Sequence, residues 1–136
     1  MKTVGFFKSL KLKRALDVID LGCGTAILSI AALKLGARHA LGVDIDADAI
    51  QAARENAQAN GTAERLELGL GSLAEIRAGQ FSLQQANIVL ANILAPVLTR
   101  LLDEGLEDIL TPEGYLILSG ILEEQAQGVI AAAQRH

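Results

Sequence analysis

The sequence predicts an α/β protein with a Rossmann-like, doubly wound parallel sheet of about five strands in the order 3-2-1-4-5. Two observations support this fold class. Short runs rich in Val, Ile and Leu alternate along the chain with longer stretches of helical periodicity, which is typical of βαβ units joined by right-handed crossovers. The short runs are apolar almost throughout, as expected of parallel strands that are buried on both faces.

Each element can be placed from its own signals. We expect strands at residues 15–21, 40–43, 65–70, 86–91 and 115–119. We expect helices at residues 27–35, 47–60, 94–110 and 123–134, with a short helix or turn at 72–79. Asp46 is the expected N-cap of the second helix, and the Asn-Gly pair at 60–61 ends it. Pro96 fits only the first turn of a helix, and residues 112–114 predict a turn before the last strand.

The composition is that of one globular domain. The chain has 136 residues, of which 51% are hydrophobic and 21% charged, so it can bury a core and is not expected to be disordered. It contains three Phe, one Tyr and no Trp. Proteins that bind single-stranded nucleic acid stack bases on aromatic side chains, so this composition argues against that class.

Charge is distributed unevenly along the sequence. Residues 1–14 contain five basic and no acidic side chains, whereas the rest of the chain contains seven basic and 16 acidic ones, a net charge of −9. We therefore divide the chain into a basic N-terminal segment, 1–14, and a domain, 15–136. The acidic domain is a poor match for nucleic acid, and no direct nucleic-acid binding is expected. The basic segment suits contact with phosphate or acidic protein, although such segments are more often simply solvated.

Cysteine, histidine and apolar runs exclude other classes. Cys23 is the only cysteine, which rules out a disulfide within the chain and a cysteine-based zinc cluster. His39 and His136 are far apart in the sequence, so no metal site is expected. No apolar run approaches the ~18 residues of a transmembrane helix, and the apolar stretch at the N-terminus is too short for a signal peptide. We expect a cytoplasmic protein that does not interact with membranes.

The strongest local motif is Asp20-Leu21-Gly22-Cys23-Gly24-Thr25, between the first expected strand and the first helix. Glycine allows positive φ and the close approach of a ligand, and the following helix start offers free N–H groups and a positive dipole end. This arrangement is typical of a nucleotide-binding loop, although a Gly-x-Gly pattern alone also occurs in plain turns.

An acidic residue follows the second expected strand. Asp44 lies 22 residues after Gly22, where a carboxylate can accept hydrogen bonds from both hydroxyls of a ribose. The alternative is that Asp44 or Asp46 only caps the next helix. We assign the cap to Asp46 and the ribose to Asp44.

The sequence lacks the two common phosphate-binding motifs, and this narrows the kind of nucleotide that the glycine loop can bind. A dinucleotide fingerprint, Gly-x-Gly-x-x-Gly/Ala, needs Gly or Ala at position 27, where this chain has Ile27. A P-loop needs Gly-Lys-Ser/Thr, which the sequence does not contain. A ligand with a ribose but no phosphates fits better, and S-adenosylmethionine is the obvious candidate. A nicotinamide-dependent dehydrogenase is correspondingly disfavoured.

Asn92 directly follows the fourth expected strand. In a doubly wound sheet, strands one and four flank the crevice where ligands bind, so this side chain should face a ligand held by strands one and two. Its amide carbonyl can accept a hydrogen bond from an incoming amine. The alternative is that Asn92 is the N-cap of the helix that begins at residue 94.

Four stretches carry a more specific resemblance: DLGCGTAILSI at 20–30, GVDIDADAIQAARENAQAN at 42–60, ANILA at 91–95 and SGILEEQ at 119–125. Together they resemble the class I methyltransferase domain of the enzymes that trimethylate protein eleven of the large ribosomal subunit. The resemblance covers roughly residues 15–134. The Asn-Ile-Leu-Ala stretch is its most discriminating part.

The resemblance implies an S-adenosylmethionine-dependent enzyme that transfers methyl groups to a lysine or α-amino nitrogen of a ribosomal protein. It implies that Gly22 and Gly24 lie under the methionine part of the cofactor, that Asp44 binds the ribose and that Asn92 acts in catalysis by orienting the acceptor amine. Ser72 would contact the adenine. The other expected cofactor contacts are Asp20, Cys23 and Ile45, with Cys23 packing beside the cofactor rather than acting as a nucleophile.

The chain departs from the family pattern in several places. Family members read Gly-x-Gly-Ser/Thr-Gly in the loop, but this chain has Ala26 in place of the last glycine, which should fit if its φ is negative. The sequence contains neither the family's separate substrate-docking domain nor two further strands, so we expect a truncated sheet whose fifth strand, 115–119, is an open edge. An open apolar edge pairs readily with another chain, which predicts self-association. The alternative function is a catalytically inactive fragment, or a cofactor-binding interaction module that needs a partner chain.

Overall fold

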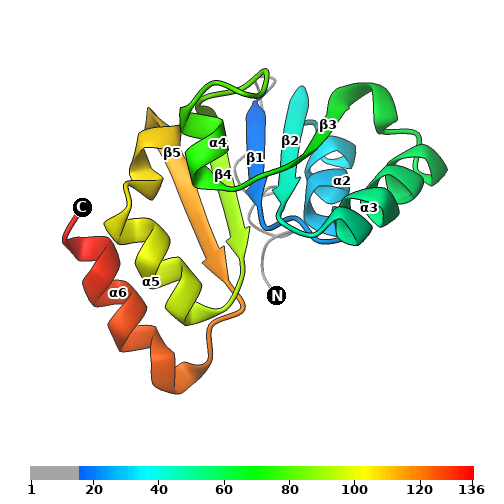
Figure 1. Cartoon of the computed structure of the whole chain (residues 1–136). Helices are drawn as coiled ribbons and strands as arrows, with labels where there is room; N and C mark the ends of the chain where they lie inside the picture. Colours follow the sequence, from blue (N-terminus) through cyan, green and yellow to red (C-terminus); the bar gives the residue numbers. More distant parts are fainter. Residues whose placement is uncertain (1–15) are drawn as a thin grey trace.

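The computed structural model describes residues 16–136, so the basic segment expected at 1–14 lies outside the described residues. Its strands are β1 (Asp17–Leu21), β2 (His39–Asp44), β3 (Leu66–Leu70), β4 (Ala86–Asn92) and β5 (Leu110–Ser119). All neighbours are parallel, and the strands form one sheet in the order β3-β2-β1-β4-β5 (Figure 1). The predicted fold class and strand order are therefore confirmed.

Helices connect these strands and cover both faces of the sheet. They are α2 (Ile27–Lys34), α3 (Ala47–Ala59), α4 (Leu73–Arg77), α5 (Ala95–Asp103) and α6 (Ala126–Gln134). Short 3₁₀ turns occur at Ala63–Arg65, Leu106–Ile109 and Glu123–Gln125. Most predicted boundaries agree with these to within one or two residues, and the helix expected at 123–134 begins as the last of these 3₁₀ turns.

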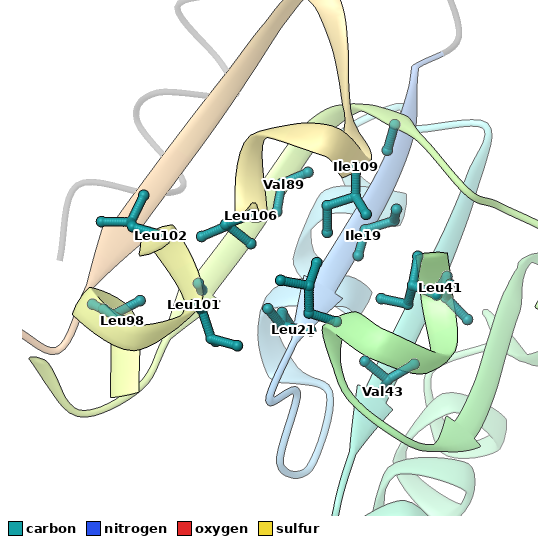
Figure 2. Close-up of a cluster of buried hydrophobic side chains, with 14 of the residues drawn as sticks. Ile19, Leu21, Leu41, Val43, Val89, Leu98, Leu101, Leu102, Leu106 and Ile109 are labelled. Carbon is teal, nitrogen blue, oxygen red and sulfur yellow. The ribbon is translucent and has the colours of Figure 1, made fainter. Parts of the chain in front are cut away.

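Each face of the sheet has its own hydrophobic core, because successive side chains of a strand point to opposite faces. Val18 packs with α2 and α3, together with Ile88 and Leu90 of β4. Ile19 and Leu21 pack with α4, α5 and α6 on the other face, and Figure 2 shows Leu21 beside Leu101 of α5 and Ile19 beside Ile109. The five strand side chains are at most 1% exposed. Burial on both faces explains why the strand sequences are almost continuously apolar.

The prediction of one helix over residues 94–110 is wrong for the second half of that range. α5 ends at Asp103, and Gly105 follows with a φ of +94°, a left-handed conformation that glycine adopts without steric strain. The chain then forms a 3₁₀ turn that buries Leu106 and Ile109 completely, after which β5 begins. Leu106 and Ile109 are therefore buried in a turn rather than in the second half of the predicted helix.

The turn predicted at 112–114 lies inside β5 rather than before it. The pairing of β4 with β5 shifts there, because Ala86 is opposite Leu110 whereas Ile88 is opposite Tyr115. Gly114 lies at this irregularity, where a Cβ would come within 2.9 Å of a carbonyl oxygen of β4. From Tyr115 onward the pairing is regular, as expected for the strand at 115–119.

Candidate functional site

An apolar pocket of about 490 Å³ lies at the carboxyl edge of the sheet, a volume typical of small-molecule sites. The ends of β1, β2 and β4 and the loops that follow the strands form its walls. Five residues predicted from the sequence line it, namely Gly22, Asp44, Ile45, Ser72 and Asn92. The crevice expected from the strand order is therefore present at the expected edge of the sheet.

A smaller cavity of about 230 Å³ adjoins this pocket and shares Gly22 and Asn92 with it. It is lined by the remaining three predicted residues, Asp20, Cys23 and Gly24. All eight predicted site residues thus surround two cavities that have walls in common. The part that each residue takes in binding a ligand stays a prediction.

Backbone contacts hold the turn after β1 against β2. The Cys23 N–H donates to the Val43 carbonyl (2.9 Å), and Gly22 and Gly24 have φ values of +67° and +55°. A Cβ on Gly22 would lie 2.5 Å from the Ile93 side chain, so only glycine lets the loop after β4 pack this closely. The glycine motif thus shapes a wall that both cavities share.

Ala26 has a positive φ, so the condition under which alanine should fit the loop, a negative φ, is not met. Its φ is +64°, and within residues 16–136 it is the only residue other than glycine with a positive φ. The left-handed conformation costs an alanine about 1–2 kcal/mol. Ala26 is fully buried, and its carbonyl accepts the first hydrogen bond of α2 from the Ile30 N–H (2.9 Å). Contacts of the turn, rather than the preference of the residue, therefore set this backbone angle.

Asp44 ends β2 and is half-buried. Its Oδ2 accepts from the Gly24 N–H (2.9 Å) and its Oδ1 from the Asp46 N–H (2.9 Å). Asp46 in turn caps α3 by accepting from the Asp48 N–H (2.9 Å), so the predicted assignment of the cap to Asp46 is confirmed. A carboxylate has about four acceptor positions, so Asp44 retains capacity for two further hydrogen bonds.

Asp20 is a buried carboxylate beside the smaller cavity, with 2% of its surface exposed. The Ser29 hydroxyl donates to its Oδ2 (2.6 Å). Burial raises the pKa of Asp20 to about 6, because the charged form loses its hydration; the Ser29 hydrogen bond opposes this rise and the charge of Asp44 adds to it. At pH 7 Asp20 is therefore mostly ionised, and it presents a poorly hydrated negative charge next to the cavity.

The Cys23 thiol is unsuited to nucleophilic chemistry. Burial, followed by the charges of Asp20 and Asp44, raises the pKa of Cys23 to about 12. A thiol that stays protonated at neutral pH is a poor nucleophile. Its Sγ lies 3.1 Å from where a Cβ on Gly42 of β2 would be, so it fits a space that glycine leaves open. This agrees with the packing role expected from the sequence.

Asn92 is exposed at the end of β4, next to a glycine that follows β5. A Cβ on Gly120, whose φ is +78°, would lie 2.7 Å from Asn92 Oδ1. Glycine at this position therefore leaves the space that the Asn92 amide occupies. The N-cap of α5 is Leu94, so the alternative capping role for Asn92 is wrong.

Sequence reasoning misses several walls of the larger pocket, including Ile93, Leu94, Arg100 and Gly120. Ile93 and Gly120 lie in the ANILA and SGILEEQ stretches, which the sequence identifies without assigning roles to these side chains. Arg100 lies on α5 outside any motif. Leu94 and Ile45, which both line the pocket, are 72% and 83% exposed.

Comparison with known proteins identifies the family. A family model described as ribosomal protein L11 methyltransferase (PrmA) matches residues 4–136 of this chain. The chain belongs to the ribosomal protein L11 methyltransferase family. This confirms the family resemblance found in the glycine loop, the Asp44 segment and the ANILA and SGILEEQ stretches.

Curated ribosomal protein L11 methyltransferases are similar to this chain over most of its length. The one from Sodalis glossinidius is 53% identical over 119 residues, which are 88% of this chain and 38% of that protein. The one from Haemophilus ducreyi is 50% identical over 115 residues, which are 85% of this chain and 37% of that protein. The chain thus spans less than two-fifths of the length of these L11 methyltransferases.

Solved structures agree with this family assignment. A ribosomal protein L11 methylase from Lactobacillus delbrueckii subsp. bulgaricus matches with a TM-score of 0.80 at 31% identity, over 98% of this chain and 66% of that one. An RNA methyltransferase from Salinibacter ruber in complex with S-adenosyl-L-homocysteine matches with a TM-score of 0.68 at 28% identity, over 85% of this chain and 72% of that one. The chain thus has the predicted class I methyltransferase fold.

Two other kinds of site are absent from the part of the chain that the structure describes. No helix among residues 16–136 is long and apolar enough to span a membrane. In the same range, no three or more His, Cys, Asp or Glu side chains are grouped so that they could hold a metal ion. His39 lies near Glu67 (3.9 Å), whereas His136 lies near Asp103 (3.4 Å).

Asp20→Asn is expected to stabilise the fold at alkaline pH and to have little effect at acidic pH. The pKa of Asp20 is about 6 in the folded chain against an ordinary value of 3.8. Below pH 3.8 the Asp20 carboxyl is neutral in both the folded and the unfolded chain, so it does not lower the free energy of unfolding. As the pH rises through 6 the buried group must ionise in the folded chain, and this free energy is lost. In Asp20→Asn the amide oxygen still accepts from Ser29 but never ionises. The variant therefore avoids the fall in the free energy of unfolding, which is on the order of 3 kcal/mol at pH 8.

Urea unfolding of wild type and Asp20→Asn between about pH 4 and pH 8 measures this difference. Asp48→Asn removes an exposed carboxylate and serves as the matched control, for which no such trend is expected. A difference between Asp20→Asn and wild type that stays constant with pH contradicts the raised pKa.

Proposed function

We propose that this chain is the cofactor-binding part of an S-adenosylmethionine-dependent protein N-methyltransferase, which methylates a lysine or α-amino nitrogen of a ribosomal protein in the cytoplasm. The observation that carries the proposal is a glycine turn tied to Asp44 on one side of a pocket, with Asn92 on the other. Family membership supports the reaction, and the names of the curated L11 methyltransferases support the substrate. The Salinibacter ruber structure with S-adenosyl-L-homocysteine supports the cofactor.

The larger pocket fits a nucleoside without phosphates. Asp44 retains acceptor capacity for two ribose hydroxyls beyond the two backbone N–H groups that it already binds. Ile45 and Ser72 line the pocket beyond the ends of β2 and β3, where an adenine would meet an apolar wall and a polar group. Asp20 and Asp44 would repel a pyrophosphate, which agrees with the missing phosphate-binding motifs.

The smaller cavity fits the amino-acid part of the cofactor. Gly22 and Gly24 would lie under it, and no atom comes within 4 Å of where a Cβ on Gly24 would be. Cys23 would pack beside it as a neutral thiol. Asp20 would attract its protonated amino group, because a poorly hydrated carboxylate interacts strongly with a nearby cation.

Asn92 would align the acceptor amine. When bound, S-adenosylmethionine supplies a methyl group on a positively charged sulfur, which becomes a neutral thioether once the methyl has left. Asn92 Oδ1 would accept a hydrogen bond from the amine and hold its lone pair toward the methyl carbon.

A lysine amine has an ordinary pKa of about 10.4, so it must lose a proton before it attacks. Asn92 cannot take this proton, so the amine would release it to solvent, and burial in the apolar pocket would favour the neutral amine by desolvation.

Titration calorimetry with S-adenosylmethionine, and then with S-adenosyl-L-homocysteine, tests the cofactor site. Wild type should bind both, and Asp44→Ala should bind about 100-fold more weakly because two hydrogen bonds to a charged group are lost. Asp48→Ala removes the same charge from an exposed position on α3 and should bind like wild type. No binding at millimolar ligand by a chain shown to be folded contradicts the proposal.

Methyl transfer to ribosomal protein L11 from labelled S-adenosylmethionine tests the role of Asn92. Asn92→Ala should lower kcat about 100-fold, the effect of a misaligned acceptor, with a much smaller change in the affinity for S-adenosyl-L-homocysteine. A variant that keeps full transfer and normal cofactor affinity would remove Asn92 from this role. Equal losses in both measurements would make Asn92 a binding residue only.

Self-association through β5 also forms part of the proposal. Within residues 16–136, β5 is at one end of the sheet and pairs with β4 alone. Leu116, Ile117 and Leu118 make this edge strand apolar, and edge strands offer backbone N–H and C=O groups to a second strand.

Sedimentation velocity at tens of micromolar should therefore reveal dimers or larger species that dissociate on dilution. Tyr115→Lys adds a charge to the exposed part of the edge and should shift the chain toward the monomer. A wild-type chain that sediments only as a monomer contradicts pairing through β5.

A further inference from the structure

Two side chains from the β2–α3 region hold the turn after β1 by its backbone. Asp44 Oδ2 accepts from the Gly24 N–H (2.9 Å), and Asn56 Nδ2 donates to the Thr25 carbonyl (3.0 Å). Asn56 lies on α3, 31 residues beyond Thr25, so this contact exists only in the folded chain. Gly24 and Ala26, the two residues on either side of Thr25, both have a positive φ.

Ala26 makes this turn prone to leave its conformation. An alanine is disfavoured in the left-handed region because its Cβ approaches a carbonyl oxygen, whereas glycine is not. The Ala26 N–H donates to the Cys23 carbonyl (2.9 Å), which closes the turn but attaches it to no other element. Asn56 holds the carbonyl of the peptide group that joins Thr25 to Ala26. It thereby restrains the orientation of that peptide plane, and with it the φ of Ala26.

α3 is a firm support for this contact. Asp46 caps its first turn, and the Asp46 N–H is itself bound by Asp44. At the other end, Asn60 Nδ2 donates to the Asn56 carbonyl (2.8 Å). Asn56 is half-buried and lines neither of the two site cavities, whereas Thr25 lines the smaller one. Any effect of Asn56 on a ligand must therefore pass through the turn.

We propose that Asn56 is a positioning residue, which holds the Thr25 carbonyl so that the turn keeps its ligand-binding conformation with alanine at position 26. The effect on binding rests on the proposed function, whereas the tether itself does not. The two parts can be tested separately.

Amide hydrogen exchange in the ligand-free chain tests the tether. Asn56→Ala should speed exchange at Gly24 and Ala26 about 3- to 10-fold, the effect of one lost hydrogen bond. Asn56→Asp keeps the side-chain shape but lacks the donor, and it should act in the same way. Alanine is a good helix former, so Asn56→Ala leaves α3 intact. Gln58→Ala removes an exposed amide side chain from the same helix and should leave both amides at wild-type rates.

Calorimetric affinity for S-adenosyl-L-homocysteine tests the consequence for binding. Asn56→Ala should bind about 3- to 10-fold more weakly, and Gln58→Ala should bind like wild type. In an Ala26→Gly background, Asn56→Ala should lose less than about 2-fold, because glycine adopts the left-handed conformation without the tether. A general loss of α3 stability would not be relieved by Ala26→Gly.

Each outcome decides part of the proposal. If the Gly24 and Ala26 amides exchange at the wild-type rate in both Asn56 variants, Asn56 does not restrain the turn. This holds whether or not the ligand binds. If Asn56→Ala lowers the affinity equally in the wild-type and the Ala26→Gly chains, Asn56 does not compensate for the strained backbone of Ala26. If wild type does not bind the ligand while exchange at the turn still depends on Asn56, the proposed function fails and the positioning role stands.

Discussion

The close approach of the β1–α2 turn to the end of β2 is the constraint on which the site depends. The Cys23 N–H continues the sheet pairing to Val43, and the next N–H is taken by the Asp44 carboxylate. Gly42 permits this approach, because a Cβ there would lie 3.1 Å from the Cys23 sulfur. The path of the turn then determines where α2 starts and where both cavities lie.

The loops after β4 and β5 are built onto this turn, and glycines determine how closely they pack. Ile93 occupies the space in front of Gly22, and Asn92 occupies the space beside Gly120. Because β1 pairs with both β2 and β4, the distance between Asp44 and Asn92 is determined by a rigid parallel sheet. A pocket whose opposite walls belong to one sheet is pre-organised for its ligand, which limits the ordering that binding requires.

The buried charge of the site opposes folding but suits a cationic ligand. Asp20 has hydrogen bonds from Ser29 in place of its hydration, and its raised pKa reflects the incomplete compensation. The same carboxylate helps to keep the Cys23 thiol protonated. Destabilising groups of this kind are common in functional sites, where ligand contacts rather than fold stability account for them.

Local signals in the sequence determined much of this protein: the alternation of strands and helices, the glycine turn, Asp46 as a helix cap, and the placement of Asp44 and Asn92 at the ends of strands. Periodicity, capping and turn chemistry act between neighbouring residues, so the sequence alone displays them. Only the tertiary structure decided the left-handed φ of Ala26, the early end of α5 at Gly105, the space that Gly120 leaves for Asn92, and the contact of Asn56 with Thr25. Each of these depends on packing or hydrogen bonds between segments far apart in the chain, which overrides the preference of the single residue.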